Sequence, residues 1–105
     1  MTPTPQGISR LLASAGYERA TSTPSRVKGL RNWSEGFAVE GYGHGEVFVR
    51  HVLRSIHPGD RDRAHRLKEE GRYAETITAA GYEVRRSAVR RGLLVTSSPA
   101  TPEEG

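Results

Sequence analysis

The first apolar pattern along the chain has the period of an α-helix. Its apolar residues recur at the spacing i, i+3, i+4 and i+7, so they share one face of a helix. They are Ile8, Leu11, Leu12 and Ala15. Thr4 and Pro5 precede this stripe as N-cap and first helical residue, and Gly16 follows it as a left-handed C-terminal cap. The pattern predicts an amphipathic helix that starts at Pro5 and stops at Gly16.

In the middle of the chain the apolar period changes to two, which is typical of strands with one buried face. Phe37 and Val39 form the first alternating run, and the second consists of Val47, Val49, His51 and Leu53. The segment Gly41-Tyr42-Gly43-His44-Gly45 lies between the runs and supplies residues that tolerate positive φ. We therefore predict a β-hairpin here.

A second helix and a second hairpin follow. His57-Pro58-Gly59-Asp60 predicts a turn that ends in a capping aspartate, Asp60. The helix is expected from about Arg61 to Ala80, with a kink or break at Gly71 as an option. Its core-facing residues would be Ala64, Leu67, Ala74 and Ile77. The final hairpin is predicted to pair residues 82–87 with residues 92–96.

Two features of the order of elements leave alternatives open. Ala15-Gly16-Tyr17-Glu18 recurs 65 positions later as Ala80-Gly81-Tyr82-Glu83, each time closing a predicted helix. Two explanations fit this repeat. The same helix C-cap sequence can arise twice independently, or a unit of one helix and its strands can be duplicated. Residues 18–33 fit either a twisted strand with a loop or a short helix that opens at Thr23-Pro24.

Together the elements predict an α+β fold with two helices on one face of a small antiparallel sheet. Their order is α-ββ-α-ββ, with possible internal duplication. The domain is expected over residues 6–96, between a disordered N-terminal tail (1–5) and a disordered acidic C-terminal tail (97–105), because both ends are poor in apolar side chains. The predicted core consists of Leu11, Leu12, Phe37, Val47, Val49, Leu67, Ile77, Val84 and Val95.

Length and composition narrow the class of protein. The 105 residues provide for one domain, and the absence of cysteine excludes disulfides, thiolate metal sites and cysteine nucleophiles. No apolar run approaches the roughly 20 residues of a spanning helix, and no signal peptide opens the chain. These observations favour a cytoplasmic protein with no membrane partner.

The basic residues are concentrated in two stretches, each of which follows a Gly-Tyr helix stop. The chain has a net charge of +4, and 14 of its 16 basic residues are arginine, which suits phosphate recognition. The residues predicted to contact nucleic acid are Arg26, Lys28, Arg31, Arg85, Arg86, Arg90 and Arg91. If the two units pack alike, both stretches lie at one end of the sheet and make a phosphate-binding surface. Charges at a hairpin tip add little stability, so reversing the last four should leave the fold intact.

No pattern indicates catalysis, a cofactor or a metal site. The spacings of His44, His51, His57 and His65 match no zinc motif, and no carboxylates are interleaved among them at ligand spacing. His51 is expected to be a hydrogen-bonded, half-buried histidine, and Ser34 and Ser55 belong to no nucleophile motif. Lys68-Glu69-Glu70 is interpreted as part of an exposed, mixed-charge helix face. We therefore expect neither an enzyme nor a metalloprotein.

Three segments carry a resemblance to a known group of proteins. The run from Ile8 to Tyr17, the segment Ser25-Arg26-Val27-Lys28-Gly29 and the segment Ser34-Glu35-Gly36-Phe37 are similar to small proteins of actinobacterial phages and integrative plasmids. These proteins have no assigned activity, so the resemblance implies only a mobile-element setting, in which short basic proteins often regulate or package nucleic acid.

Two functions remain in competition. The first is a small accessory or regulatory protein that binds nucleic acid, most simply duplex DNA, mainly through phosphates. In the alternative interpretation, the arginines bind no nucleic acid and are solvated turn residues of a protein from an arginine-rich proteome. The second function is then a protein-interaction module, a host-modulating or assembly protein whose interface includes Trp33 or Phe48.

Overall fold

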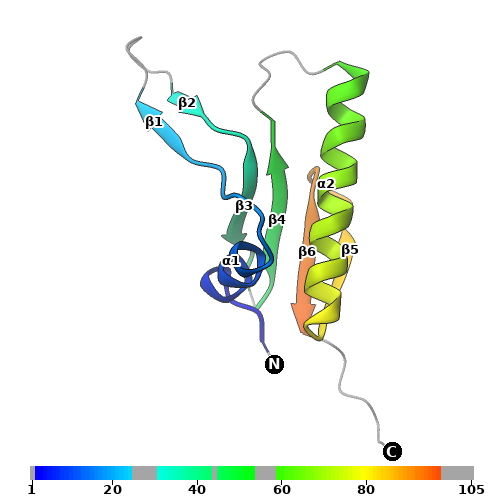
Figure 1. Ribbon diagram of the computed structural model, residues 1–105. Coiled ribbons are helices and arrows are strands. Elements are labelled where there is room, and N and C mark those ends of the chain that lie inside the picture. Colours follow the sequence, from blue (N-terminus) through cyan, green and yellow to red (C-terminus); the bar gives the residue numbers. More distant parts are fainter. Residues whose placement is uncertain (1, 25–30, 44, 54–58, 98–105) are drawn as a thin grey trace, which may run out of the picture.

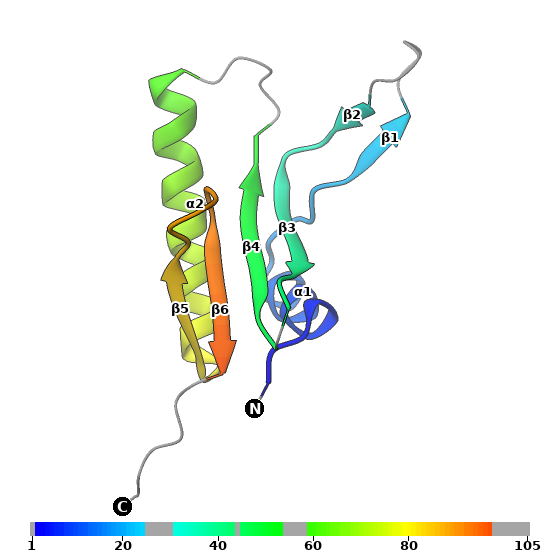
Figure 2. The ribbon, with the colours of Figure 1, turned by 180° about the vertical axis from the view of Figure 1, so that it is seen from behind.

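The computed structural model describes residues 2–24, 31–43, 45–53 and 59–97, and within them both helices cover one face of an antiparallel sheet (Figures 1 and 2). The sheet has four strands in the order β3-β4-β6-β5. The main elements are α1 (Pro5–Ser14), β3 (Gly36–Gly41), β4 (Val47–Val52), α2 (Asp60–Ala79), β5 (Tyr82–Arg86) and β6 (Leu93–Ser97). The predicted α+β class, the two hairpins and the α-ββ-α-ββ order are confirmed.

Between α1 and β3 lies a separate two-stranded ribbon. It consists of β1 (Ser22–Pro24) and β2 (Arg31–Trp33), which pair antiparallel with Ser22 opposite Trp33. The stretch whose structure the sequence left open therefore forms strands on both sides of residues 25–30, which lie outside the described part of the chain. The option of a helix opening at Thr23-Pro24 is wrong, because both residues belong to β1.

The core lies between the inward face of the sheet and the two helices. Residues of β4 and β6 meet in register at its centre, with Val47 opposite Val95 and Val49 opposite Leu93. From the helices, the core receives Ile8, Leu12, Tyr73 and Ile77, all of which are buried. Of the predicted core, Leu12, Phe37, Val47, Val49, Ile77 and Val95 are buried, and Leu11 and Val84 are half-buried.

The ends of α1 follow the predicted chemistry. Thr4 caps the helix, because its hydroxyl oxygen accepts the backbone N–H of Gly7 at 3.0 Å. Pro3, which precedes this cap, is also buried. Gly16 and Gly81 end their helices with φ of 97° and 101°, a conformation that favours glycine. α1 has 10 residues and α2 has 20, so the shared stop motif terminates helices of different size.

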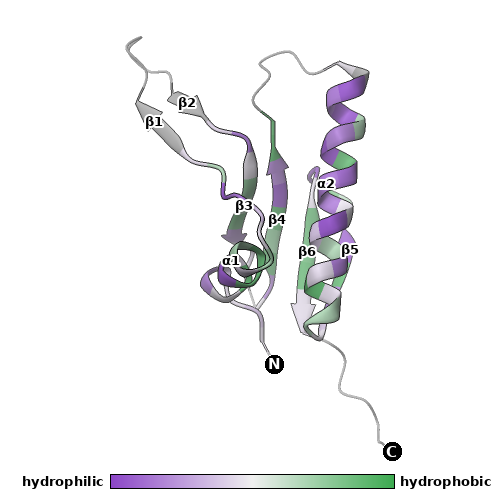
Figure 3. Cartoon of the chain, in the orientation of Figure 1, coloured by the Kyte–Doolittle hydropathy of each residue, from purple (hydrophilic) through white to green (hydrophobic). Residues whose placement is uncertain are grey.

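The second helix departs from the sequence prediction at its N-terminal half. Leu67, predicted in the core, is 45% exposed, and Ala64 is exposed as well. The 20 residues of α2 span about 30 Å, whereas strands of five or six residues cover roughly 17–20 Å. The first turns of α2 therefore extend past the sheet, and Figure 3 shows that they are mainly hydrophilic.

The N-cap residue of α2 differs from the prediction, and the structure decides whether the helix breaks at Gly71. Gly59 is the N-cap residue and Asp60 the first helical one, so the predicted cap is displaced by one position. The carboxylate that satisfies the backbone N–H of Gly59 belongs to Asp62, at 3.2 Å. The helix continues through Gly71 without a break. Among the described residues, neither helix combines the length and the apolar character needed to cross a membrane.

The segment after α1 is fastened to the start of β3. The backbone N–H of Phe37 donates to Glu18 O at 2.9 Å, and that of Ala20 donates to Phe37 O at 2.8 Å. Gly36 permits this approach, because a Cβ there would lie 2.5 Å from Glu18 O and 2.7 Å from Ala20 N. Only glycine fits at this position without a backbone shift.

We expect the same substitution to have opposite effects at two glycines. Gly36→Ala should lower the free energy of unfolding by about 1–3 kcal/mol, because the added methyl group collides with backbone atoms. Gly71→Ala should raise it by about 0.5–1 kcal/mol, since nothing lies within 4 Å of the position that the added methyl group would take in α2. Urea unfolding of the three proteins measures both changes. A stable Gly36→Ala variant would contradict the close approach of residues 18–20 to β3.

Candidate functional site

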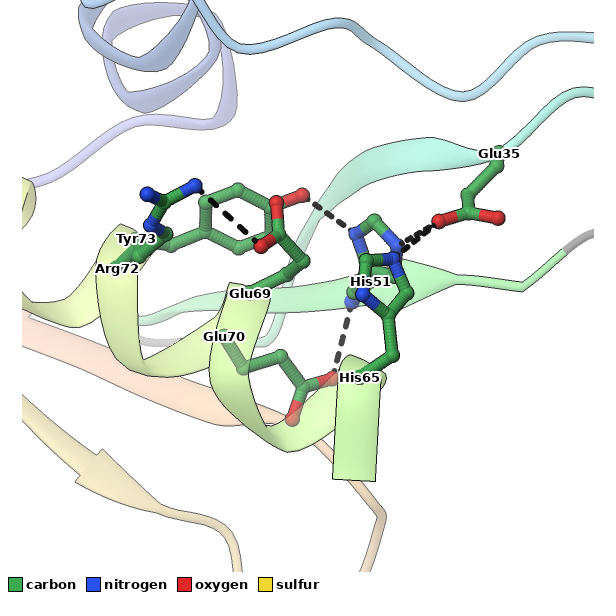
Figure 4. A network of polar contacts seen from close by, with 7 residues as sticks. All are labelled: Glu35, His51, His65, Glu69, Glu70, Arg72 and Tyr73. Atoms are coloured by element: carbon green, nitrogen blue, oxygen red, sulfur yellow. Dashed lines mark hydrogen bonds and ion pairs between the residues drawn. The ribbon is translucent and has the colours of Figure 1, made fainter. Parts of the chain in front are cut away.

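A concentrated group of polar side chains lies in a cleft between the segment that follows α1, the helix α2, the strand β4 and the start of β3. Three of its residues are Glu35, His51 and His65, which we call the Glu–His cluster (Figure 4). They come from three parts of the fold: Glu35 directly precedes β3, His51 lies on β4 and His65 on α2. The cleft has a volume of about 460 Å³.

The backbone on either side of Glu35 is held in place. Ser34 exchanges bonds with Thr21: its N–H donates to Thr21 O at 2.8 Å, and its Oγ accepts the N–H of Thr21 at 2.9 Å. On the other side, Gly36 is packed against residues 18–20. Ser34 therefore has a structural role, and Glu35 is presented from a fixed point.

One carboxylate oxygen of Glu35 joins the two imidazoles. Glu35 Oε2 lies 2.9 Å from His51 Nε2 and 2.6 Å from His65 Nε2. The hydrogen bond from His51, and then that from His65, holds the pKa of the Glu35 carboxyl below its usual range, against the opposing effect of partial burial. Glu35 is therefore an anion that only accepts, and both Nε2 atoms carry the hydrogen.

Tyr73 occupies the other side of the His51 ring. Its hydroxyl lies 2.6 Å from His51 Nδ1, and when the ring is neutral with its hydrogen on Nε2, the hydroxyl donates to Nδ1. Burial, followed by the nearby Glu69 and Glu35 carboxylates, raises the pKa of Tyr73 above its usual range, so it remains a phenol. His51 is thus hydrogen-bonded at both nitrogens, as the sequence predicted, although it is buried and not half-buried.

Beneath the cleft, Glu70 is a completely buried carboxylate. Its Oε2 accepts the backbone N–H of His51 at 3.0 Å, and its Oε1 accepts Arg86 at 2.8 Å and Arg66 at 3.2 Å. The interpretation of Glu70 as an exposed helix residue is wrong. Three donors from β4, β5 and α2 offset the cost of burying its charge.

On the other side of α2, several arginines line a second hollow of about 270 Å³. Arg66 comes from α2, and Arg86, Arg90 and Arg91 come from the end of β5 and the turn that follows. We call this hollow, lined by Arg66, Leu67 and residues 86–92, the arginine groove. The turn is shaped by Ser87, whose Oγ accepts the N–H groups of Val89 and Arg90 at 3.2 Å.

The structure distributes the predicted nucleic-acid residues unevenly. Arg26 and Lys28 lie outside the described residues, and Arg31 lies in β2 opposite Pro24. The four arginines of the last hairpin are all exposed at the opposite edge of the sheet. In Figure 2 the β1–β2 ribbon lies beyond the β3 edge of the sheet and the β5–β6 hairpin forms the opposite edge, so these two stretches of backbone are not brought together.

Two of these four arginines have structural partners. Arg86 binds the buried Glu70, so the expectation that all four could be reversed without harm to the fold is wrong. Arg90 pairs with Glu40 at 2.6 Å and lies over the Phe48 ring, 4.2 Å from its centroid. Phe48 is completely buried and offers no surface to a partner, so of the two residues expected at the interface of an interaction module it is not the one that could serve. Arg85 and Arg91 make no ion pair within the described residues.

Sequence reasoning missed the Glu–His cluster and the contribution of Arg66. Glu35 is 16 positions from His51 and 30 from His65. It lies just before a strand, so no helical spacing links it to the two histidines. One indication of the cluster was present in the sequence: His51 lies on the inward face of its predicted strand. Because buried polar groups are hydrogen-bonded, a buried His51 needs polar partners nearby. Compared with protein-family models, with curated protein sequences and with solved structures, the chain gives no significant match. The chemistry of these side chains is therefore the guide to function.

Removal of the Tyr73 hydroxyl tests the polar contacts of His51. Tyr73→Phe should lower the free energy of unfolding by about 1–3 kcal/mol, because it leaves the buried Nδ1 of His51 without a partner. Tyr82→Phe is the matched control and should change it by less than about 0.5 kcal/mol, since that hydroxyl has no hydrogen bond within the described residues. Equal effects in urea unfolding would show that the Tyr73–His51 bond adds no stability.

Proposed function

We propose that the protein binds nucleic acid, most simply duplex DNA, through phosphate contacts made by the arginine groove and the neighbouring Arg85. The observation that carries this proposal is the gathering of four guanidinium groups around one hollow. Arginine suits phosphate oxygens because its planar fork of donors can bind two of them at once.

The balance of charge around the groove supports an anionic ligand. Arg66 and Arg86 share the single carboxylate of Glu70, and Arg90 has Glu40. Four positive charges therefore face two carboxylates, and one of the four, Arg91, has no ion pair among the described residues. Arg85 precedes Arg86 in β5 and is exposed, although it does not line the groove itself. The surplus is sufficient to attract phosphates, and no described element identifies a reader of base edges, so sequence preference should be modest.

In this proposal the protein acts as an accessory or regulatory factor of a mobile genetic element, in the cytoplasm. A specific observation also favours the alternative of a protein partner. Leu67 is 45% exposed and Val89 is 83% exposed, and both line the arginine groove. Exposed apolar side chains next to charged ones are a common composition for protein interfaces.

Salt dependence separates the two functions. With about four to six phosphate contacts, log K for duplex DNA should fall against log salt with a slope near −4 to −5. The double variant Arg85→Glu, Arg91→Glu should reduce the magnitude of this slope by about 2, because each lost contact removes close to one released counterion. Neither residue has a structural partner in the described chain, so circular dichroism should show an intact fold.

The matched control is Arg61→Glu, Arg63→Glu, which makes the same change of charge at the exposed start of α2. It should alter the slope by less than about 1, because it removes no groove contact. If both double variants weaken binding equally, net charge alone is responsible and the groove is not the site. If the wild-type protein shifts neither DNA nor RNA at low salt and micromolar concentration, the nucleic-acid proposal is wrong. A partner retained at high salt would then support the interaction module.

A further inference from the structure

We propose that the Glu–His cluster is a binding site for one divalent transition-metal ion, with Zn²⁺ as the best match. Glu35, His51 and His65 each offer one ligand atom, and the three atoms lie within 4.8 Å of one another (Figure 4). Two imidazole nitrogens and one carboxylate oxygen are among the common ligand sets of zinc.

The separations between the ligand atoms suit a metal of this size. Zinc bonds of about 2.0–2.1 Å in a tetrahedron place neighbouring ligand atoms about 3.3 Å apart. Glu35 Oε2 now lies 2.9 Å from His51 Nε2 and 2.6 Å from His65 Nε2. Small rotations that open these two contacts by less than about 1 Å, and that bring the two imidazole nitrogens, which lie within 4.8 Å of each other, to a similar separation, would admit the ion.

The three ligands differ in mobility in a way that favours capture of an ion. His51 is buried and is held at its backbone by Glu70. The side chains of Glu35 and His65 are 37% and 47% exposed, so they can adjust and leave an entry path from the cleft. The fixed ligand, His51, therefore sets the position of the ion, and the two adjustable ligands complete its coordination.

Tyr73 supplies the outer partner that a metal-bound histidine requires. A metal ion on Nε2 of His51 would select the neutral form with hydrogen on Nδ1, which lies 2.6 Å from the Tyr73 oxygen. The hydroxyl, which donates in the metal-free form, would then accept, as ordered outer partners of ligating histidines do. Tyr73 is 1% exposed, so the ring cannot move away.

The chemistry of the ligand set selects the metal. Mg²⁺ and Ca²⁺ prefer shells made of oxygen, and Cu⁺ prefers sulfur, which none of the three ligand residues offers. Imidazole nitrogen favours Zn²⁺, Co²⁺ and Ni²⁺. Three protein ligands leave a coordination position open toward the cleft, in which Arg72 and Glu69 also lie.

The test is calorimetric titration of tag-free protein with ZnCl₂, with visible absorption of added Co²⁺ as a probe of geometry. We expect one ion per chain, a cobalt spectrum of nitrogen and oxygen ligands, and a thermal midpoint that rises with zinc concentration. His65→Ala and Glu35→Gln should each weaken zinc binding at least tenfold, and Tyr73→Phe should weaken it about 10–100-fold through His51. Lys68→Ala, an exposed position on the same helix, is the control and should bind like the wild type.

Two results would overturn the proposal. One is the absence of heat and of thermal stabilisation at millimolar zinc in folded wild-type protein, which would leave a hydrogen-bonded cluster only. The other is equal zinc affinity of His65→Ala and the wild type. The metal proposal is separate from nucleic-acid binding, because none of the three ligands lines the arginine groove. His65→Ala should therefore keep the salt slope for DNA unchanged.

Discussion

The buried carboxylate of Glu70 is the interaction on which the arrangement of this protein depends. A charge without solvent is costly unless it is fully hydrogen-bonded, and Glu70 meets this condition with donors from three elements. The backbone N–H of His51 belongs to β4, the Arg86 guanidinium to β5, and the Arg66 guanidinium to α2 itself. The small apolar core supplies the general attraction between helices and sheet, and Glu70 sets where α2 lies along the sheet.

The same residue separates and orients two regions of different chemistry. On one side of α2, its Oε2 holds the backbone of His51, whose ring meets Glu35 and Tyr73 in the cleft. On the other side, its Oε1 holds Arg86, and Arg66 donates to both carboxylate oxygens, at the arginine groove. Neighbouring residues of α2, His65 and Arg66, thus serve different sides of the helix, since consecutive helical residues point about 100° apart. This is possible because the first turns of α2 extend past the sheet. They do not pack in the core, so their side chains can be hydrophilic.

Local patterns in the sequence predicted most of the fold, and long-range pairing accounts for most of what they missed. α1 and both hairpins followed from caps, turns and apolar periods, because each of these signals lies within one element. Leu67 was misplaced because helical periodicity does not reveal how far a helix outruns its sheet. Glu70 was misplaced because its burial depends on Arg86, 16 residues away. The Glu–His cluster needed three elements to be positioned before its ligands could be recognised, and the inward-facing His51 was its only trace in the sequence.

Glu70→Gln tests this account most directly. The substitution keeps the shape of the side chain but replaces one acceptor oxygen with an NH₂ group, which must face either the His51 N–H or a guanidinium group. We expect a loss of at least about 2 kcal/mol in the free energy of unfolding, measured with urea. Glu75→Gln, on the exposed face of the same helix, should change it by less than about 0.5 kcal/mol. A Glu70→Gln variant as stable as the Glu75→Gln control would contradict the central role of the buried carboxylate.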